Sequence, residues 1–435
     1  MTDVVVVGAG VAGLAAAAAL RRAGAACDVL EAAGRIGGRA WTENPAALGG
    51  EAFDHGASWL HAAERNPLAE IARAHGDGLS QSPAERLRRV MLDGRAATAE
   101  ELGEYERAWE RFTEVATARA DREPDTSLAD AVAELRGDPW TATIETFEST
   151  LIAAAPPEQF SVRDWRLNQL SGTNLNVAGG LGALVARRLL PAAGAVRLRT
   201  PVSRIGWGPR GVSVTTPSGT LSARACVVTV STGVLAAGGI AFAPALPAAQ
   251  QAAIAGLPMG LLTKVALRPA DGGALGLPAR SSLYRRVAAA GDPSISFSVF
   301  PGGSGILVGF IGATAAWELS RAGAAATEAF ARAELSALLG ARAEFTGAVA
   351  TGWGADELHR GAYAYALPGH DGARAAMDAP VGPLVFAGEA WCTDGLAGTV
   401  GGAFLSGERA AAMALRLLGG YGPSTAAPAG QSEGP

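Results

Sequence analysis

The sequence predicts a fold of the α/β plus α+β class, in which a Rossmann-like domain is joined to a discontinuous domain of mixed sheet and helices. The order of features near the N-terminus predicts the Rossmann-like domain. A run of four valines at residues 4–7 leads directly into a glycine-rich turn at residues 8–13 and an alanine-rich helix. A second apolar stretch, residues 27–30, ends at the acidic residue Glu31. Strand, glycines, helix, second strand and acid follow one another as in a unit that binds a dinucleotide.

Each glycine of the turn has a reason of its own. Gly8 permits the tight turn, Gly10 lets the backbone approach a pyrophosphate, and Gly13 lets the helix pack closely on the strand. Ala12 lies at the start of this helix, whose free N–H groups and positive dipole end suit phosphates. Glu31 stands where a carboxylate accepts hydrogen bonds from a ribose hydroxyl. A βαβ unit that is purely structural is the alternative interpretation.

A second loop indicates which dinucleotide is bound. Residues 34–39 read Gly-Arg-Ile-Gly-Gly-Arg and follow the acidic residue almost at once. Gly38 and its neighbouring glycine, between Arg35 and Arg39, give a flexible backbone and fixed positive charge beside a pyrophosphate, and the planar guanidinium suits phosphate. A nicotinamide enzyme has no need of this second cradle, so the sequence predicts FAD. The alternative is a loop with two solvated arginines.

Length, charge and cysteine content limit the class of protein. The 435 residues suffice for two or three domains, and the net charge of −5, without a basic run, argues against nucleic-acid binding. Cys27, Cys226 and Cys392 are scattered, so neither a metal site nor a disulfide framework is expected. No apolar stretch reaches transmembrane length and the chain begins on its first strand, so we expect a soluble cytoplasmic protein that does not bind membranes.

The remainder of the chain predicts the domain layout. One apolar stripe at helical spacing comprises Leu102, Tyr105, Trp109, Phe112 and Ala116. Residues 212–216 and 225–230 flank the turn-like sequence Pro-Ser-Gly and predict a hairpin. We expect an FAD-binding domain of residues 1–75, 176–245 and 366–420, a substrate-binding domain of residues 76–175 and 246–365, and a disordered tail of residues 421–435.

Further motifs follow in a fixed order along the chain. They occupy residues 54–61, 179–184, 259–265, 361–363, 385–389 and 398–403. Together with the N-terminal glycines, they resemble the flavin-containing amine oxidase family of monoamine oxidases, polyamine oxidases and lysine-specific histone demethylases. The resemblance spans residues 3–418 and favours the polyamine oxidase branch.

The resemblance implies cofactor contacts at matching positions. These positions are Gly56, Ala57, Ser58, Trp59, Val202, Trp353, Gly388, Glu389, Thr399 and Val400. It places Val202 at the adenine, Gly388 and Glu389 at the ribityl–phosphate region, and Thr399 and Val400 at the flavin. A helix that begins after Gly398 would point its positive end at the flavin, in agreement with this assignment.

The resemblance also implies the catalytic positions. Lys264 lies in an apolar strand-like segment and would hold a water against flavin N5 and assist reoxidation; an edge-strand lysine that reaches solvent is the alternative. Tyr363 would form one wall of an aromatic cage, whose other wall falls at Thr399, so the paired cage is lost. His61 would bind or orient the amine, or support a neighbouring residue. Ala362 replaces the cysteine that carries covalent flavin in monoamine oxidases, so we expect noncovalent FAD.

The implied reaction is oxidation of a primary or secondary amine, mono- or polyamine. Hydride passes to flavin N5, water hydrolyses the imine, and O2 reoxidises the flavin and gives H2O2. The partners are then a small-molecule amine and O2, and both a monomer and a homodimer stay open. Trp391 and Cys392 have no assigned role.

Three alternatives stay open at the level of sequence. An L-amino-acid oxidase would need a cation for the substrate carboxylate, and Arg163, Arg166 and Arg285 are candidates. A pathway-specific flavin oxidase or desaturase could use the same frame. The third alternative is a flavin-dependent binding protein without an enzymatic role.

Overall fold

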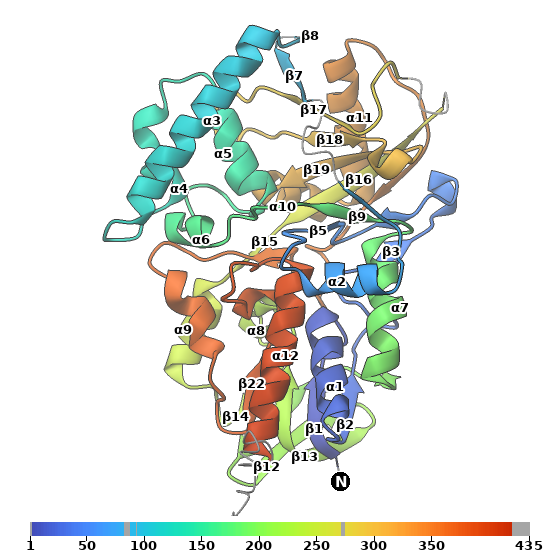
Figure 1. Ribbon diagram of the computed structural model, residues 1–435, viewed down its shortest axis with the longest axis vertical. Coiled ribbons are helices and arrows are strands. Elements are labelled where there is room, and N and C mark those ends of the chain that lie inside the picture. The colour runs from blue at the N-terminus through green and yellow to red at the C-terminus, as the bar shows by residue number, and fades with distance from the viewer. Residues whose placement is uncertain (1, 82–87, 93, 271–274, 420–435) are drawn as a thin grey trace, which may run out of the picture.

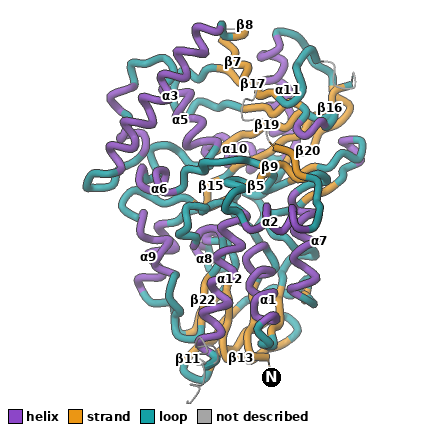
Figure 2. Tube along the Cα trace, viewed as in Figure 1, coloured by secondary structure: helices purple, strands orange, loops and turns teal. Residues whose placement is uncertain are grey.

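The computed structural model describes residues 2–81, 88–92, 94–270 and 275–419. Two halves lie one above the other along its long axis, each built around its own large sheet (Figure 1). Loops and short helices join the halves at mid-height (Figure 2). The predicted tail, residues 421–435, lies outside the described residues.

The lower half is built around an eight-stranded sheet with the order β10-β2-β1-β13-β12-β11-β14, and β22 also pairs with β13. Its strands are β1 (Thr2–Val7), β2 (Cys27–Leu30), β10 (Val196–Arg197), β11 (Arg204–Gly208), β12 (Gly211–Thr216), β13 (Gly219–Val228), β14 (Ala241–Ala243) and β22 (Leu384–Phe386). β1 runs parallel to β2 and β13, and β22 runs parallel to β13. β12 and β13 form an antiparallel hairpin as predicted, but its second arm is Gly219–Ala223, ahead of the predicted residues 225–230. This arrangement confirms the Rossmann-like unit.

Three long helices pack on this sheet: α1 (Val11–Arg22), α7 (Leu181–Ala193) and α12 (Val400–Leu417). The alanine run of α1 is almost entirely buried, because small side chains allow neighbouring helices to approach closely. At the crossing with α12, a Cβ added to Gly407 would lie only 2.2 Å from the carbonyl oxygen of Ala12. The small residues of α1 therefore allow α12 to pack closely against it.

The upper half contains a seven-stranded sheet with the order β20-β16-β19-β18-β17-β7-β8. Its strands are β7 (Arg88–Leu92), β8 (Arg95–Ala96), β16 (Leu262–Pro269), β17 (Ser281–Arg285), β18 (Ser296–Val299), β19 (Leu307–Gly312) and β20 (Phe345–Ala350). Its helices are α3 (Ala99–Ala120), α4 (Leu128–Ala131), α5 (Thr141–Glu145), α6 (Val162–Leu167), α10 (Ala313–Ala322) and α11 (Ala324–Leu339). Tyr105, Phe112 and Ala116 of α3 are buried, as the helical stripe predicts.

The remaining elements are short, and several of them lie between the halves (Figure 1). They are β3 (Thr42–Glu43), β4 (Phe53–Asp54), β5 (Trp59–Leu60), β6 (Leu79–Gln81), β9 (Leu175–Val177), β15 (Met259–Gly260), β21 (Tyr363–Ala364), α2 (Pro67–Ala74), α8 (Thr232–Ala236) and α9 (Ala248–Gly256). We propose the predicted segments as the two domains, with one adjustment. α9 falls in the predicted substrate-binding segment, yet Ala253 and Ile254 belong to the apolar core of the lower sheet.

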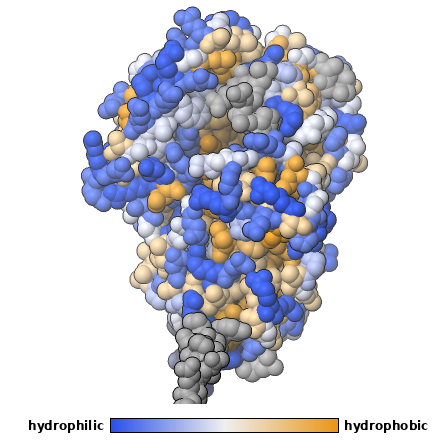
Figure 3. Space-filling view, viewed as in Figure 1, coloured by the Kyte–Doolittle hydropathy of each residue, from blue (hydrophilic) through white to orange (hydrophobic). Residues whose placement is uncertain are grey.

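The molecular surface is mostly polar on the face shown in Figure 3, with smaller apolar groups among hydrophilic side chains. In the part of the chain that the structure describes, no helix combines the length and apolarity needed to cross a membrane.

Candidate active site

A cavity of about 1220 Å³ runs from the N-terminal glycine turn into the upper half. Most of the predicted site residues line it, although they come from distant parts of the sequence. The predicted positions on its walls are Gly8, Gly10, Ala12, Glu31, Gly38, Arg39, Gly56, Ala57, Ser58, Trp59, His61, Val202, Lys264, Trp353, Tyr363, Gly388, Glu389, Thr399 and Val400. Among the described residues, two predicted positions, Gly13 and Arg35, stand back from the cavity.

The glycine turn has the geometry that a bound phosphate needs. Gly8 has a φ of 105°, which disfavours any residue with a side chain. A Cβ at Gly10 would meet no protein atom within 4 Å, so that position is open toward the cavity. A Cβ at Gly13 would lie 1.9 Å from the Gly8 carbonyl oxygen, as close helix–strand packing requires. No side chain caps the first N–H groups of α1, which leaves them for a ligand.

Glu31 both braces this turn and faces the cavity. Its two carboxylate oxygens accept hydrogen bonds from the backbone N–H groups of Ala9 and Ala33, each at 2.7 Å. Each oxygen keeps capacity for a second donor. The carboxylate is thus fixed in place with acceptor sites directed at the ligand region, as a ribose hydroxyl would need.

The two arginines of the second loop differ in placement. Arg39 donates to the Glu389 carboxylate and to the Ala362 carbonyl oxygen, both at 2.8 Å, and lines the cavity. The Arg35 guanidinium instead lies 4.4 Å from the centre of the Trp41 ring and donates to the Gly38 carbonyl oxygen at 2.7 Å. Arg35 therefore shapes the loop from behind, whereas the prediction placed both arginines beside the pyrophosphate.

Glu389 is held by a cation and by a backbone N–H group, which explains a buried acid on the cavity wall. It is buried, forms the ion pair with Arg39, and accepts from the Ala364 N–H group at 3.2 Å. The preceding Gly388 has a φ of 141° and donates its N–H to Ser406. This network joins the loop after β2 to the C-terminal segment around a single point of the cavity wall.

Lys264 lies on β16 and reaches down from the upper sheet to the loop that follows β4. Its ammonium donates to the carbonyl oxygens of Asp54 and Gly56 and to the hydroxyl of Ser58. The rings of Trp59 and Phe310 lie 5.8 and 5.7 Å from its Nζ atom. Burial lowers the pKa of Lys264 to about 8, although nearby Asp54 opposes the shift. Lys264 is therefore a buried, titratable cation, and the alternative of a solvated edge lysine is wrong.

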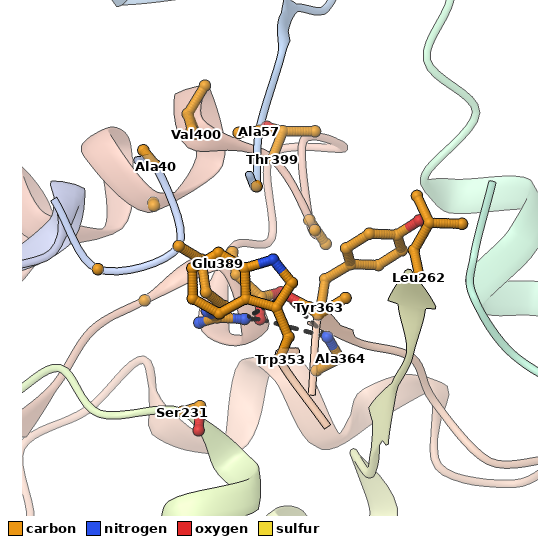
Figure 4. A pocket seen from close by; sticks show the side chains of 18 of the residues that line it. Ala40, Ala57, Ser231, Leu262, Trp353, Tyr363, Ala364, Glu389, Thr399 and Val400 are labelled. Atoms are coloured by element: carbon orange, nitrogen blue, oxygen red, sulfur yellow. Dashed lines mark hydrogen bonds and ion pairs between the residues drawn. The ribbon is translucent and has the colours of Figure 1, made fainter. Parts of the chain in front are cut away.

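Tyr363 and Thr399 lie near one another on the side of the cavity that also contains Leu262 (Figure 4). The Tyr363 hydroxyl donates to the Leu151 carbonyl oxygen at 3.2 Å, and burial raises its pKa. The Thr399 side chain accepts from the Gly402 N–H at 3.0 Å and so caps α12. The second wall of the predicted aromatic cage would lie at this position, and a threonine that caps α12 occupies it instead.

Two further predicted residues are fixed by hydrogen bonds. Trp353 is buried and donates its indole N–H to the His55 carbonyl oxygen at 2.9 Å. The His61 Nδ1 atom lies 2.8 Å from the Asn174 side-chain oxygen, and its ring is tilted against Trp59. His61 is thereby oriented at the cavity wall by a neighbour that the sequence did not reveal.

Several residues that line the cavity were not predicted from the sequence. Glu148 lies on the π-helical segment η3 (Thr146–Leu151), which also contributes Phe147 and Leu151 to the wall. Arg360 lines the cavity, and its buried Nε atom has no hydrogen-bond partner among the described residues. These residues carry no motif, and a π-helical bulge has no signal in hydrophobic periodicity. Trp391 and Cys392 are buried and, in the described structure, do not line the cavity.

The residues present fit a flavin dinucleotide. The open Gly10, the uncapped helix end and Arg39 suit phosphates, and the fixed carboxylate of Glu31 suits ribose. Beyond them, the same cavity continues to Lys264 and to a region with aromatic side chains that includes Tyr363.

Comparisons with known proteins agree with this geometry. The protein resembles polyamine oxidase 4 of Oryza sativa subsp. japonica, with 28% identity over 94% of this chain and 88% of the relative. It also resembles lysine-specific histone demethylase 1 homolog 1 of the same plant, with 29% identity over 95% of this chain but 52% of the relative. Putrescine oxidase bound to putrescine shares the fold, with a TM-score of 0.74 and 23% identity over 94% of this chain and 98% of that one.

The family described as flavin containing amine oxidoreductase matches residues 11–415, nearly the whole length of the described chain. This match confirms the resemblance inferred from the motifs and favours an enzyme over a binding protein. The chain therefore belongs to the flavin-containing amine oxidoreductase family and is an amine oxidase that depends on a flavin.

Proposed function

We propose that the protein uses noncovalently bound FAD to oxidise a primary or secondary amine, with dioxygen as the final electron acceptor. Bound FAD would supply the acceptor of a hydride equivalent from the α-carbon of the amine and pass two electrons to dioxygen, which gives hydrogen peroxide. Water then hydrolyses the imine product. The observation that carries the proposal is one continuous cavity, which joins the phosphate-binding turn at Gly10 to Lys264 and Tyr363.

The residues of the chain would position the amine and select its protonation state. Tyr363 is held by Leu151 and presents its ring to the cavity, while Leu262 adds an apolar wall. The Lys264 cation disfavours a second positive charge nearby, and so favours the neutral amine, the form that can lose a hydride. Burial of these groups excludes water and strengthens each electrostatic effect. Ala362 leaves no thiol at its position for covalent attachment of the cofactor.

The contacts of the three candidate arginines do not support an L-amino-acid oxidase. Arg163 pairs with Glu123 at 2.7 Å, and Arg285 pairs with Glu334 at 3.3 Å. None of the three candidates, Arg166 included, is among the described residues that line the cavity. Two other arginines on the cavity wall are already paired, Arg39 with Glu389 and Arg374 with Asp164.

Purified protein provides the test. We expect a yellow flavin spectrum, and denaturation with acid should release FAD into the supernatant. Anaerobic mixing with a panel of amines and L-amino acids should bleach the flavin with amines only, and admission of air should restore the colour with release of hydrogen peroxide. Flavin that stays with the precipitated protein would contradict noncovalent binding. Bleaching by L-amino acids alone would favour an L-amino-acid oxidase. Slow recovery of the flavin colour in air would indicate an electron acceptor other than dioxygen.

A further inference from the structure

Arg360 is a cation on the cavity wall that the proposed reaction does not use. Among the described residues that line the cavity, it is the one arginine whose side chain forms neither an ion pair nor a hydrogen bond. Arg39 and Arg374, the others, each pair with a carboxylate. The Nε atom of Arg360 is also buried, and a buried N–H group without an acceptor costs about 1–3 kcal/mol. Its guanidinium therefore lacks an acceptor that a ligand in the cavity could supply.

The backbone holds Arg360 in a conformation that a residue with a side chain seldom adopts. Its φ is 54°, in the left-handed region. A hydrogen-bonded turn fixes this conformation, since the Arg360 N–H donates to the Asp356 carbonyl oxygen at 2.8 Å. The Asp356 carboxylate in turn accepts from the Leu358 N–H and lies 2.8 Å from Nδ1 of His359. Glycine would adopt this φ without cost, so an arginine here indicates a use for its side chain.

A chain of contacts links Arg360 to the glycine turn. The Thr229 hydroxyl donates to the Gly8 carbonyl oxygen at 3.3 Å. Two residues later, Ser231 donates to the carbonyl oxygen of the residue before Arg360, at 2.7 Å. A Cβ added to Gly233, on α8, would lie 3.0 Å from the Cβ atom of Arg360. Thr229, Ser231 and Arg360 all line the cavity, so they form one stretch of wall that starts at the glycine turn.

The charges already described at this end of the cavity do not balance a diphosphate, which is a dianion at neutral pH. The N-terminus of α1 offers about half a positive charge. Among the described side chains that line the cavity near the turn, Arg39 is neutralised by Glu389, and Glu31 adds a carboxylate. Arg35 packs on a tryptophan behind the loop. An unpaired guanidinium supplies the missing charge, and its planar fork suits phosphate oxygens.

We propose that Arg360 binds the diphosphate of FAD, together with the N-terminal turn of α1. This assignment rests on the proposed function, because it gives a binding residue to the cofactor named there. The first residues of the chain would supply backbone N–H groups, and the loop before β21 would supply the neutralising charge. A substrate carboxylate is the competing anion. The contact with Gly233 favours the diphosphate, since it sets Arg360 on the stretch of wall that starts at the glycine turn.

Titration of apoprotein with nucleotides tests this assignment. Quenching of flavin fluorescence follows FAD, and isothermal titration calorimetry follows ADP and adenosine. Arg360→Met should weaken binding of FAD and of ADP roughly 10- to 100-fold, the range for loss of a hydrogen bond to a charged group. It should leave the affinity for adenosine, which has no phosphate, close to that of the wild type. Arg360→Lys keeps the charge and should recover part of the lost affinity.

Arg360→Gly separates a role in binding from a role in folding. Because glycine adopts a φ of 54° without strain, the apoprotein of this variant should unfold at the wild-type temperature or above it. It should nevertheless lose affinity for FAD and ADP as Arg360→Met does. Arg286→Met is the matched control, since Arg286 is a half-buried arginine outside the described cavity lining. This control should bind all three ligands like the wild type.

Unchanged affinity for ADP in Arg360→Met and Arg360→Gly would overturn the proposal. Equal losses for ADP and adenosine would also overturn it, because they would indicate a distorted pocket rather than a lost phosphate contact. Unchanged ADP affinity, combined with loss of flavin bleaching by L-amino acids, would assign Arg360 to a substrate carboxylate instead. Wild-type apoprotein that binds no FAD would contradict both this assignment and the proposed function. Bound FAD that no amine bleaches would contradict the proposed function alone.

Discussion

Lys264 donates a hydrogen bond to the hydroxyl of Ser58, and this contact joins the upper sheet to the loop after β4, which lines the cavity. The same ammonium binds the backbone carbonyl oxygens of Asp54 and Gly56. A neutral lysine has only two N–H groups, so in that form Ser58 would become a donor to Nζ. The hydroxyl thus accommodates either protonation state of the lysine without a change of position.

Lys264→Met should slow the reaction of the enzyme with dioxygen on the order of 10²-fold, the usual effect of removing one preorganised electrostatic group. Reduction by the amine should change much less. Stopped-flow absorbance in separate anaerobic and oxygen-mixing experiments measures the two half-reactions. Arg268→Met is the control, since Arg268 lies on the same strand with an exposed side chain. Equal oxygen rates in wild type and Lys264→Met would contradict the role.

The pH dependence of the two half-reactions should have opposite signs. Burial lowers the pKa of Lys264 to about 8, so its positive charge is present below that pH and is lost above it. The oxygen rate constant should therefore fall as pH rises through about 8, and Lys264→Met should remove this step. The reduction rate should rise with pH as the substrate amine loses its proton. Rate constants from pH 6 to pH 10 provide the measurement.

The variants Gly10→Ala and Gly13→Ala should separate an effect on flavin binding from an effect on the stability of the fold. A Cβ at Gly10 meets no protein atom within 4 Å, so this variant should fold but lose flavin, because the methyl group occupies space intended for phosphate. A Cβ at Gly13 would lie 1.9 Å from the Gly8 carbonyl oxygen, so α1 must shift, at a cost of about 1–3 kcal/mol. The flavin-to-protein absorbance ratio and thermal unfolding of the apoprotein distinguish these results. Full flavin content in Gly10→Ala would refute the assignment of the turn.

Glu389→Ala should weaken flavin binding roughly tenfold to a hundredfold, because Arg39 loses the carboxylate that orients it. Glu389→Gln should weaken flavin binding less than Glu389→Ala does, since its amide oxygen can still accept a hydrogen bond. Titration of apoprotein with FAD, followed by quenching of flavin fluorescence, gives the dissociation constants. Glu408→Gln changes a surface acid of α12 and should bind FAD like the wild type. The same affinity in all four proteins would remove Glu389 from the binding site.

Asp164→Asn should lower the free energy of unfolding by about 3–5 kcal/mol, because Arg374 would keep its charge in a buried place without a counter-ion. Asp164 receives two hydrogen bonds from this guanidinium, each at 2.7 Å, and a third from the Ala366 N–H at 2.8 Å. Urea unfolding monitored by circular dichroism measures the change. Arg22→Gln breaks an exposed ion pair and should leave the unfolding midpoint where it was.

Local patterns predict the N-terminal βαβ unit, the β12–β13 hairpin and the start of α12, because each depends on residues close together in the sequence. The placement of Arg35 is less accessible to sequence, since its packing on Trp41 depends on tertiary structure rather than on the motif. Glu148 is missed for a similar reason. A lone acid in a helical segment is normally solvated, and only the indoles of Trp109 and Trp165, from two other helices, turn it into part of a cavity wall.

The position of β13 between β1 and β22 has a consequence for how the protein is made. β22, Glu389 and α12 all come from the last part of the chain, yet they complete the sheet and cavity that the first residues begin. A chain released early from the ribosome, or cut by a protease before residue 384, would carry the glycine turn without its partners. Flavin binding should therefore require the chain through α12, and a product cut before residue 384 should stay colourless.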